Sequence, residues 1–561
     1  MNKCSNLIGN IFWEGYYLGF ADLPRRRQLP FRVHRTEGLI VSVSIDAARR
    51  MSLGEQFARR ARKHPERPAF SFGDVHRTYG EMDSRITRLA RGLQSLGVGR
   101  GDRVAVFMQN RLEVIESYFA IVRLGAIAVP VNFRLTPHEA QYVVENSGSR
   151  VLLADDVLAA DAAAVRDALD QDVQLVVCGG DHDRVGALAY EAVLCGDDSD
   201  LGIDVDENDP AFIMYTSGTT GRPKGAVITH MNLMMNSMTA MVGQDIATDG
   251  EVWLSGLPLF HIGGLNGILN YVMAGGHTIL MPSGNFAAED VVAHFERDKV
   301  TSCYFVPTQW KEICAVPGVT ERAASLRRIS WGASIAPPSV LQAMADAFPG
   351  TPNFNMFGQT EMSSVTCVLR GEDAIRKMGT VGTPVPDVEA RIVDEDMNDV
   401  RQGEVGEIVY RGPTVMKEYW QNAEATAEAF RGGWFHSGDL CVMDEEGFIT
   451  VVDRAKDMII SGGENIYCAE VEAAIDAHPK VAEVAVVGTP HPKWVETPVA
   501  YVVPTNPADP PTEDEVIAWC RERLASYKKP SAVIVADVLP RNASGKVQKF
   551  KLRNSAAAPR P

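Results

Sequence analysis

The sequence lacks the cysteine and histidine patterns of disulfide-bonded and zinc-binding proteins. Its nine cysteines are scattered, odd in number and never spaced as Cys-x-x-Cys. The twelve histidines form no cluster with the spacing of metal ligands, so a zinc site is not indicated. Scattered thiols are typical of a reducing compartment, and we therefore expect a cytoplasmic protein.

Long apolar runs and an excess of basic residues are also missing. No run approaches the ~20 apolar residues that a membrane-spanning helix needs. The first residues, interrupted by Asn6, Asn10 and Glu14, are not typical of a signal peptide. Lysine and arginine number 55 against 72 aspartates and glutamates, which gives a net charge of −17. This acidic surplus argues against a nucleic-acid-binding surface.

Residues 1–50 show no pattern that assigns them to a helix, a strand or a domain. They mix aromatic residues such as Phe12 and Trp13 with the basic cluster Arg25-Arg26-Arg27. We expect a poorly ordered extension, or a natural start at Met51. A helix lying on a membrane surface is the alternative, so a peripheral membrane contact stays open.

From residue 52 the pattern becomes regular, and the chain is too long for one ordinary core. Helical spacing alternates with short buried strands, which predicts parallel sheets covered by helices on both faces. The expected strands are 103–108, 126–131, 151–154, 278–281, 302–306 and 329–331, and the expected helices include 112–124, one opening at Thr136-Pro137, and 287–297.

After about residue 379 the pattern becomes rich in strands, which indicates a sheet subdomain or a small barrel. A final α/β piece of roughly a hundred residues follows residue 457. The predicted fold class is therefore α/β, with a large N-terminal domain of helix-covered parallel sheets plus a β-rich subdomain, and a small mobile C-terminal domain. We expect an N-terminal extension, a large domain and a small domain at 1–50, 51–455 and 456–561.

Anion-binding groups are concentrated between Thr216 and Gly225, directly after the apolar run 211–214. Glycines let the backbone approach an anion, hydroxyls donate hydrogen bonds, and Lys224 adds a positive charge. An ordinary P-loop does not fit, because only two residues separate Gly218 from Gly221. A surface turn is the other alternative. Four hydroxyls, three glycines and a lysine favour a phosphate-binding loop.

Three further motifs combine groups that suit a nucleotide. Thr360 and Glu361 pair a hydroxyl with a possible magnesium ligand, although a helix cap is the default interpretation. Asp439 is one acid among apolar residues and suits ribose hydroxyls, with a hairpin turn as the alternative. Lys546 lies in a flexible loop near the C-terminus, where disorder is the ordinary expectation.

In this order, the motifs resemble the adenylate-forming superfamily, which comprises acyl-CoA synthetases, peptide-synthetase adenylation domains and beetle luciferases. The resemblance extends from about residue 52 to residue 553. Segments 357–362 and 457–466 look most like bacterial fatty-acyl-CoA and aryl-CoA ligases. Where the family often has Trp-Gly-Glu, this chain has Trp494-Val495-Glu496.

The resemblance implies a role for each matching residue. The phosphates of ATP would contact Thr216, Ser217, Gly218, Thr219, Thr220, Gly221 and Lys224, and the adenine would contact Gly332, Ala333, Ser334, Phe357 and Gly358. Thr360 would meet the α-phosphate, Glu361 would bind Mg²⁺, and Asp439 with Arg454 would hold the ribose. His261 would gate the acyl pocket, Lys546 would be the catalytic lysine, Lys456 would be the hinge, and Gly462 and Gly463 would line the channel for coenzyme A.

The implied activity is ATP-dependent ligation of a small carboxylic acid to coenzyme A through an acyl-adenylate. We expect a fatty acid, because the candidate pocket residues Trp310, Trp331, His261, Met356 and Met362 include no obvious cation. The alternative for each aromatic residue is a place in the core, which is the default for any one of them alone. The alternatives are an aryl- or hydroxycinnamoyl-CoA ligase, an enzyme that loads a carrier protein, and a nucleotide-binding regulator without turnover. The sequence leaves the acid and the oligomeric state open.

Overall fold

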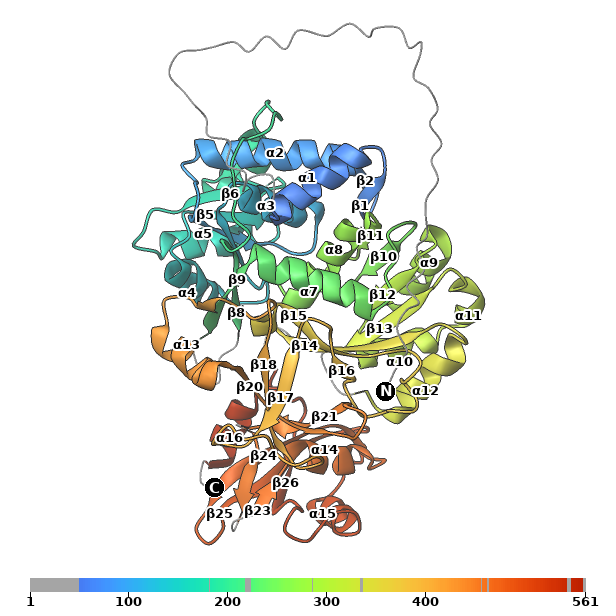
Figure 1. The fold of residues 1–561 in the computed structure, drawn as a ribbon. Coiled ribbons are helices and arrows are strands. Elements are labelled where there is room, and N and C mark those ends of the chain that lie inside the picture. Colours follow the sequence, from blue (N-terminus) through green and yellow to red (C-terminus); the bar gives the residue numbers. More distant parts are fainter. Residues whose placement is uncertain are drawn as a thin grey trace, which may run out of the picture. The chain divides into compact units, whose positions relative to one another are not determined.

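The structure is a computed structural model that describes residues 50–180, 182–216, 223–284, 286–332, 336–455, 457–461, 464–541 and 546–557 (Figure 1). The extension expected at 1–50 lies outside these residues except for Arg50. Within these ranges four sheets carry the fold, with nine, eight, five and four strands. The predicted fold class is confirmed: a large domain of helices and mainly parallel sheets precedes a smaller α/β domain. No helix in the described ranges has the length and apolar character needed to cross a membrane.

The eight-stranded sheet is parallel except at one edge, where β9 pairs antiparallel with β8 and with β19. Its order is β19-β9-β8-β4-β3-β5-β6-β7. The strands are β3 (Arg103–Phe107), β4 (Ile127–Pro130), β5 (Val151–Asp155), β6 (Gln174–Cys178), β7 (Leu188–Ala189), β8 (Pro210–Thr216), β9 (Lys224–Thr229) and β19 (Glu418–Tyr419). The connecting helices are α2 (Tyr79–Ser95), α3 (Leu112–Arg123), α4 (Pro137–Ser147), α5 (Ala159–Asp167) and α6 (Tyr190–Val193).

The nine-stranded sheet has the order β16-β15-β14-β13-β12-β10-β11-β1-β2, and its strands from β14 to β1 are parallel. They are β1 (Pro68–Phe72), β2 (Val75–Thr78), β10 (Val252–Ser255), β11 (His277–Leu280), β12 (Ser302–Tyr304), β13 (Arg328–Gly332), β14 (Asn353–Gln359), β15 (Ser364–Leu369) and β16 (Thr383–Pro384). Its helices are α1 (Leu53–Lys63), α7 (His230–Gly243), α8 (Ile262–Ala274), α9 (Ala288–Asp298), α10 (Pro307–Cys314), α11 (Val319–Arg322) and α12 (Pro338–Ala347).

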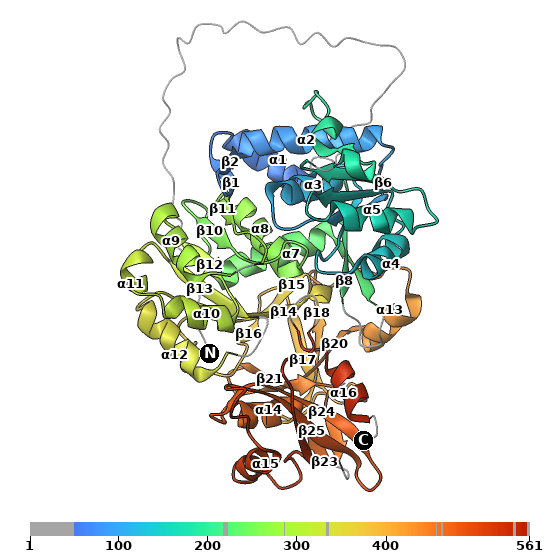
Figure 2. The same ribbon diagram turned by 180° about the vertical axis from the view of Figure 1, so that it is seen from behind.

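Helices cover both faces of the nine-stranded sheet. Apolar residues of α9, α10 and α12 pack with Ile329 and Trp331 on one face, and Figure 2 shows these helices gathered beside β12 and β13. On the other face, Ser330 and Arg328 bond to the segment at the end of α7, and Ser302 bonds to α8. Residues that alternate along β12 and β13 therefore point either to α9–α12 or to α7 and α8.

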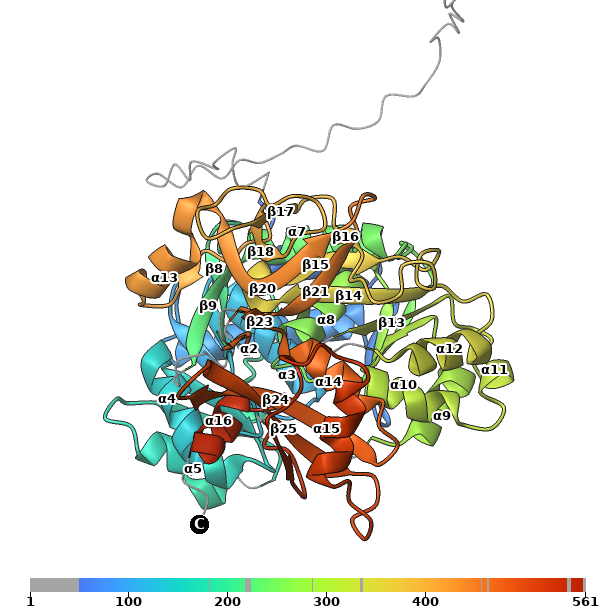
Figure 3. The ribbon, with the colours of Figure 1, turned by 90° about the horizontal axis from the view of Figure 1, so that it is seen from below.

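Two smaller sheets complete the chain. An antiparallel sheet of β17 (Glu389–Val393), β18 (Gly406–Arg411), β20 (Phe435–Met443) and β21 (Ile449–Arg454), near α13 (Ala423–Ala429), forms the β-rich part as an open sheet and not a barrel. The small domain contains β22 (Ile459–Ser461), β23 (Glu464–Ile466), β24 (Val481–His491), β25 (Val495–Pro504) and β26 (Ala532–Val535). Its helices α14 (Cys468–Asp476) and α15 (Glu513–Arg521) cover one face, and α16 (Lys549–Ala557) covers the other (Figure 3).

A buried carboxylate joins three parallel strands at their amino ends. Glu251, which precedes β10, accepts hydrogen bonds at Oε2 from the Thr301 hydroxyl (2.7 Å) and from Arg328 Nη1 (2.7 Å). Glu251 and Arg328 are 2% and 5% exposed. Burial alone would raise the pKa of Glu251, but these two bonds, the charge of Arg328 and the bond from the Ala247 N–H together lower it. The ionised group therefore fixes the relative register of β10, β12 and β13.

We predict that Glu251→Gln destabilises the fold by about 3 kcal/mol, because it leaves the Arg328 guanidinium buried without a counter-charge. Glu55→Gln is the matched control, since Glu55 pairs with Arg62 at 2.6 Å but is 38% exposed. That control should cost less than about 1 kcal/mol. Urea unfolding followed by tryptophan fluorescence measures both, and equal losses would contradict the role given to Glu251.

Candidate active site

The glycine-rich loop connects two antiparallel neighbours. Thr216, the last residue of β8, pairs with Lys224, the first residue of β9. The predicted phosphate ligands Ser217, Gly218, Thr219, Thr220 and Gly221 lie outside the described residues, so their roles stay predictions. Thr216 and Lys224 stand side by side at the two ends of the loop. This pairing places the hydroxyl of Thr216 and the ammonium group of Lys224 at the mouth of the loop.

The Glu361 carboxylate lies beside this mouth. Its Oε1 accepts hydrogen bonds from Thr216 Oγ1 (3.4 Å) and from the Tyr419 hydroxyl (3.0 Å). Lys224 Nζ lies 5.2 Å from the centre of the Tyr419 ring. Burial, and then the charge of Glu361, raises the pKa of Tyr419, so its hydroxyl remains a neutral donor. Segments far apart in the sequence thus meet at one carboxylate, whose oxygens suit a hard cation such as Mg²⁺.

Tyr419 is a site residue that the sequence does not reveal. It belongs to the two-residue strand β19, which pairs with Val227 and Ala226 of β9. A strand of two residues has no periodicity, and the surrounding Lys417-Glu418-Tyr419-Trp420 contains no glycine or hydroxyl pattern. Only the sheet topology brings it to Glu361.

Gly332 and Gly358, which are predicted to contact the adenine, are also required to be glycine by the packing around them. A side-chain carbon on Gly332 would overlap the Met356 carbonyl oxygen, and one on Gly358 would overlap the Ser364 carbonyl oxygen. Neighbouring backbones approach so closely that no other residue fits. Phe357, the residue before Gly358, is half-buried. Ala333 and Ser334 lie outside the described residues.

Asp439 and Arg454 stand opposite each other on β20 and β21. The carboxylate Oδ1 of Asp439 lies 3.0 Å from Nε of Arg454. Asp439 is 4% exposed, and its backbone N–H donates to the Ser437 hydroxyl. The pair predicted to hold the ribose is therefore preformed as a charged, oriented pair.

His261 and Lys546, predicted to serve the acid substrate, act on one another electrostatically. His261 caps the N-terminus of α8, and its Nδ1 accepts the Gly263 N–H at 3.2 Å. Burial, and then the positive charge of Lys546, lowers the pKa of His261 to about 4. The imidazole is therefore neutral at pH 7. Lys546 itself is exposed. The predicted hinge Lys456 and the predicted channel glycines Gly462 and Gly463 lie outside the described residues.

Trp310 and Trp331, two of the candidate pocket residues, belong to the hydrophobic core, which was the alternative for each aromatic residue. Trp310 is fully buried, packs edge-on against Phe305 and Phe348, and donates its indole N–H to the Ser330 carbonyl at 3.0 Å. Trp331 belongs to the same hydrophobic cluster, on the face covered by α9, α10 and α12. Met362 is also fully buried, whereas Met356 is 9% exposed.

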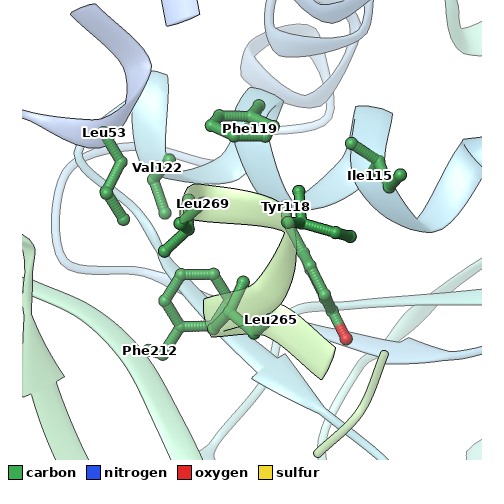
Figure 4. A pocket seen from close by; sticks show the side chains of 9 residues that line it. Leu53, Ile115, Tyr118, Phe119, Val122, Phe212, Leu265 and Leu269 are labelled. Atoms are coloured by element: carbon green, nitrogen blue, oxygen red, sulfur yellow. The ribbon is translucent and has the colours of Figure 1, made fainter. Parts of the chain in front are cut away.

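A small cavity between α1, α3, α8 and β8 is not the acyl pocket either (Figure 4). Its free volume is about 10 Å³, which is barely enough for one water molecule. The lining side chains are apolar except for Tyr118, whose hydroxyl is bonded to the Leu259 carbonyl. It is an apolar packing gap in the core.

We predict that His261 does not titrate between pH 5 and 8, because its protonated form is disfavoured by burial. Lys546→Ala should raise the pKa of His261, since it removes a positive charge, but the pKa should stay below 6.5. Proton NMR of the imidazoles measures both, with the signal assigned by its loss in His261→Gln. A midpoint near 6.5, or no change in Lys546→Ala, would contradict the geometry.

Tyr419→Phe should raise the KM for Mg·ATP about 3- to 10-fold, because it removes one hydrogen bond from Glu361. The ring that faces Lys224 remains. Tyr419→Leu removes both contacts and should cause a larger loss. The measurement is initial-rate diphosphate release with varied Mg·ATP, and an unchanged KM in Tyr419→Phe would refute the positioning role of the hydroxyl.

Comparison with known proteins agrees with this geometry. The AMP-binding enzyme family matches residues 57–420, and the AMP-binding enzyme C-terminal domain matches residues 470–546. A feruloyl-CoA synthase of Amycolatopsis sp is 39% identical over 506 residues, which cover 90% of this chain and 99% of that protein. The long-chain-fatty-acid–CoA ligase FadD13 of Mycobacterium tuberculosis is 35% identical, with coverage of 87% and 95%.

A solved structure gives the same result for the fold. The o-succinylbenzoate CoA synthetase of Bacillus subtilis, in complex with the acyl-adenylate OSB-AMP, superposes with a TM-score of 0.79. It is 34% identical and covers 90% of this chain and 98% of its own. The chain therefore belongs to the AMP-binding enzymes, in the branch of the acid–CoA ligases.

Proposed function

We propose that the acid activated by this ligase is aromatic, with its carboxylate on a short side chain as in a hydroxycinnamate. The observation that carries the proposal is the relative at 39% identity over 90% of the chain, a feruloyl-CoA synthase. The solved relative that holds the adenylate of o-succinylbenzoate, another aromatic acid, supports it. The expectation of a fatty acid depended partly on Trp310 and Trp331, which are in the core.

The ligase uses ATP, Mg²⁺ and coenzyme A, and we assign its residues to these groups as follows. Thr216 and Lys224, with the loop between them, bind the phosphates. Glu361 binds Mg²⁺, which neutralises phosphate charge, and Tyr419 orients its carboxylate. Asp439 and Arg454 hold the ribose hydroxyls, and the backbone at Gly332 and Gly358 borders the adenine.

In the first half-reaction a carboxylate oxygen of the acid attacks the α-phosphorus of ATP, and the bond to diphosphate breaks. Both reactants are anions, so a positive charge must lie between them. We assign this task to Lys546. His261 is neutral at pH 7 and therefore contributes no competing charge beside the acyl group. The product is an acyl-adenylate.

In the second half-reaction the thiol of coenzyme A attacks the adenylate carbonyl, and AMP leaves. We propose that the domain of residues 456–561 then turns about Lys456 and withdraws Lys546, while Gly462 and Gly463 line the thiol channel. The division into 51–455 and 456–561 is part of this proposal.

The test is diphosphate release with ATP and Mg²⁺ against hydroxycinnamates, arylacetates and saturated fatty acids, with and without coenzyme A. Formation of an aryl-CoA thioester together with AMP is expected. A clear preference for saturated fatty acids would refute the aromatic assignment. An acyl-adenylate that persists with coenzyme A would indicate a carrier-protein acceptor, and no diphosphate with any acid would indicate a regulator.

Lys546→Ala should lower diphosphate release at least 100-fold, because it removes the charge between two anions. It should leave thioester formation from a supplied acyl-adenylate within a few-fold of the unmodified enzyme. The two half-reactions are measured separately by mass spectrometry of the acyl products. Equal loss of both steps would contradict the assignment of Lys546 to the first.

A further inference from the structure

Tyr304 ends β12 on the face of the nine-stranded sheet that α7 and α8 cover. In the register of the sheet it stands between Ser255 of β10 and Ser330 of β13. Directly paired residues of parallel strands point to the same side, so all three side chains share this face. The sheet therefore presents a row of three hydroxyl-bearing residues near its carboxyl edge, where ligands of such sheets bind.

The Tyr304 hydroxyl reaches beyond its own row toward that edge. A side-chain carbon built on Gly332 would lie 2.7 Å from the hydroxyl oxygen. Gly332 is two residues after Ser330, the partner of Tyr304. The phenol therefore extends alongside the backbone of β13 to the segment that is predicted to meet the adenine, and the absence of a side chain at Gly332 leaves space for it.

Two hydroxyls of this row have no hydrogen-bond partner among the described residues. Tyr304 is half-buried and its hydroxyl makes no hydrogen bond there. Ser255 is completely buried, and its Oγ is likewise unpartnered. Ser330, in contrast, donates to Gln244 at 3.1 Å. Unsatisfied hydroxyls are costly in a protein interior, and their clustering beside a site indicates a ligand oxygen that completes them.

Burial keeps the phenol in its neutral form. It raises the pKa of Tyr304 well above its ordinary value. The hydroxyl is therefore a donor at every pH at which the enzyme works, and an acceptor for a phenolic hydrogen. The ring packs against an apolar cluster that includes Met356, and Phe357 packs against the same cluster. One polar group in an apolar wall is the usual arrangement for recognising a single substituent.

We propose that Tyr304 is a specificity-determining residue, whose hydroxyl bonds an oxygen substituent on the body of the acid substrate. Ser255, the neighbour of Tyr304 in the row, is a second hydroxyl without a partner among the described residues. This inference rests on the proposed aromatic acid, and it specifies that the aromatic acid carries a hydroxyl, methoxyl or keto oxygen. An acid without such an oxygen leaves the Tyr304 hydroxyl unpaired and is selected against.

The experiment compares matched acids on the purified full-length enzyme and on Tyr304→Phe. Each 3- or 4-hydroxycinnamate is paired with the cinnamate that carries a methyl group at the same position, which is similar in size but cannot form the bond. The unmodified enzyme should prefer the best hydroxy acid by about 10-fold or more in kcat/KM. Tyr304→Phe should abolish that preference by lowering kcat/KM for the hydroxy acid alone.

Tyr79→Phe is the matched control. Tyr79 is buried and donates its hydroxyl to the Gly276 carbonyl at 2.8 Å, so the substitution also removes one buried hydroxyl. It should leave the ratio between the paired acids unchanged. A change confined to Tyr304→Phe supports recognition of the substituent and not a general effect on folding.

Three results would overturn the inference. The unmodified enzyme could show no preference within the pairs, Tyr304→Phe could lower both acids equally, or Tyr304→Phe could raise the KM for ATP, which would assign the hydroxyl to the nucleotide. Each of these leaves an enzyme that activates aromatic acids, so the proposed function would stand. Preference of the unmodified enzyme for saturated fatty acids would instead refute the proposed function itself.

Discussion

The site depends on the parallel register of β10, β12 and β13. The buried carboxylate of Glu251 fixes this register at the amino ends of the strands, opposite the edge that carries the site. Glu251 bonds to Thr301, which directly precedes β12, and to Arg328, the first residue of β13. Since parallel strands in register end at one edge, this interaction determines which residues meet at the carboxyl side. A shift of one residue would turn Tyr304 and Ser330 toward α9–α12 and would bring Trp331 to the site.

At that edge, close backbone contacts and long-range side-chain contacts together form the site. Gly332 and Gly358 allow neighbouring strands to approach closely. Glu361 is oriented by hydroxyls of Thr216 and Tyr419, which come from the other large sheet. The candidate magnesium ligand Glu361 therefore connects the nine-stranded sheet to the eight-stranded sheet. The hydrogen bonds that orient its carboxylate also hold the two sheets together, so the same contacts serve stability and function.

Much of this was predictable from the sequence, because local patterns determine local structure. The strands expected at 103–108 and 151–154 and the helix expected to open at Thr136-Pro137 lie within one or two residues of the observed elements. The faces of the strands were not predictable. A sheet covered on both sides has apolar residues throughout, so the alternation that would separate Trp331 from Tyr304 is absent. Tyr419 depends on strand pairing between distant segments, which no local pattern encodes.

Activation of the carboxylate at the α-phosphorus of ATP is tested most directly with a hydroxycinnamate labelled with ¹⁸O in both carboxylate oxygens. The labelled acid is incubated with the enzyme, ATP, Mg²⁺ and coenzyme A, and the phosphorus-containing products are measured by mass spectrometry. Attack at the α-phosphorus transfers one labelled oxygen to AMP and none to diphosphate. Label in phosphate or diphosphate, with unlabelled AMP or ADP, would show activation at another phosphorus and would contradict the assigned chemistry.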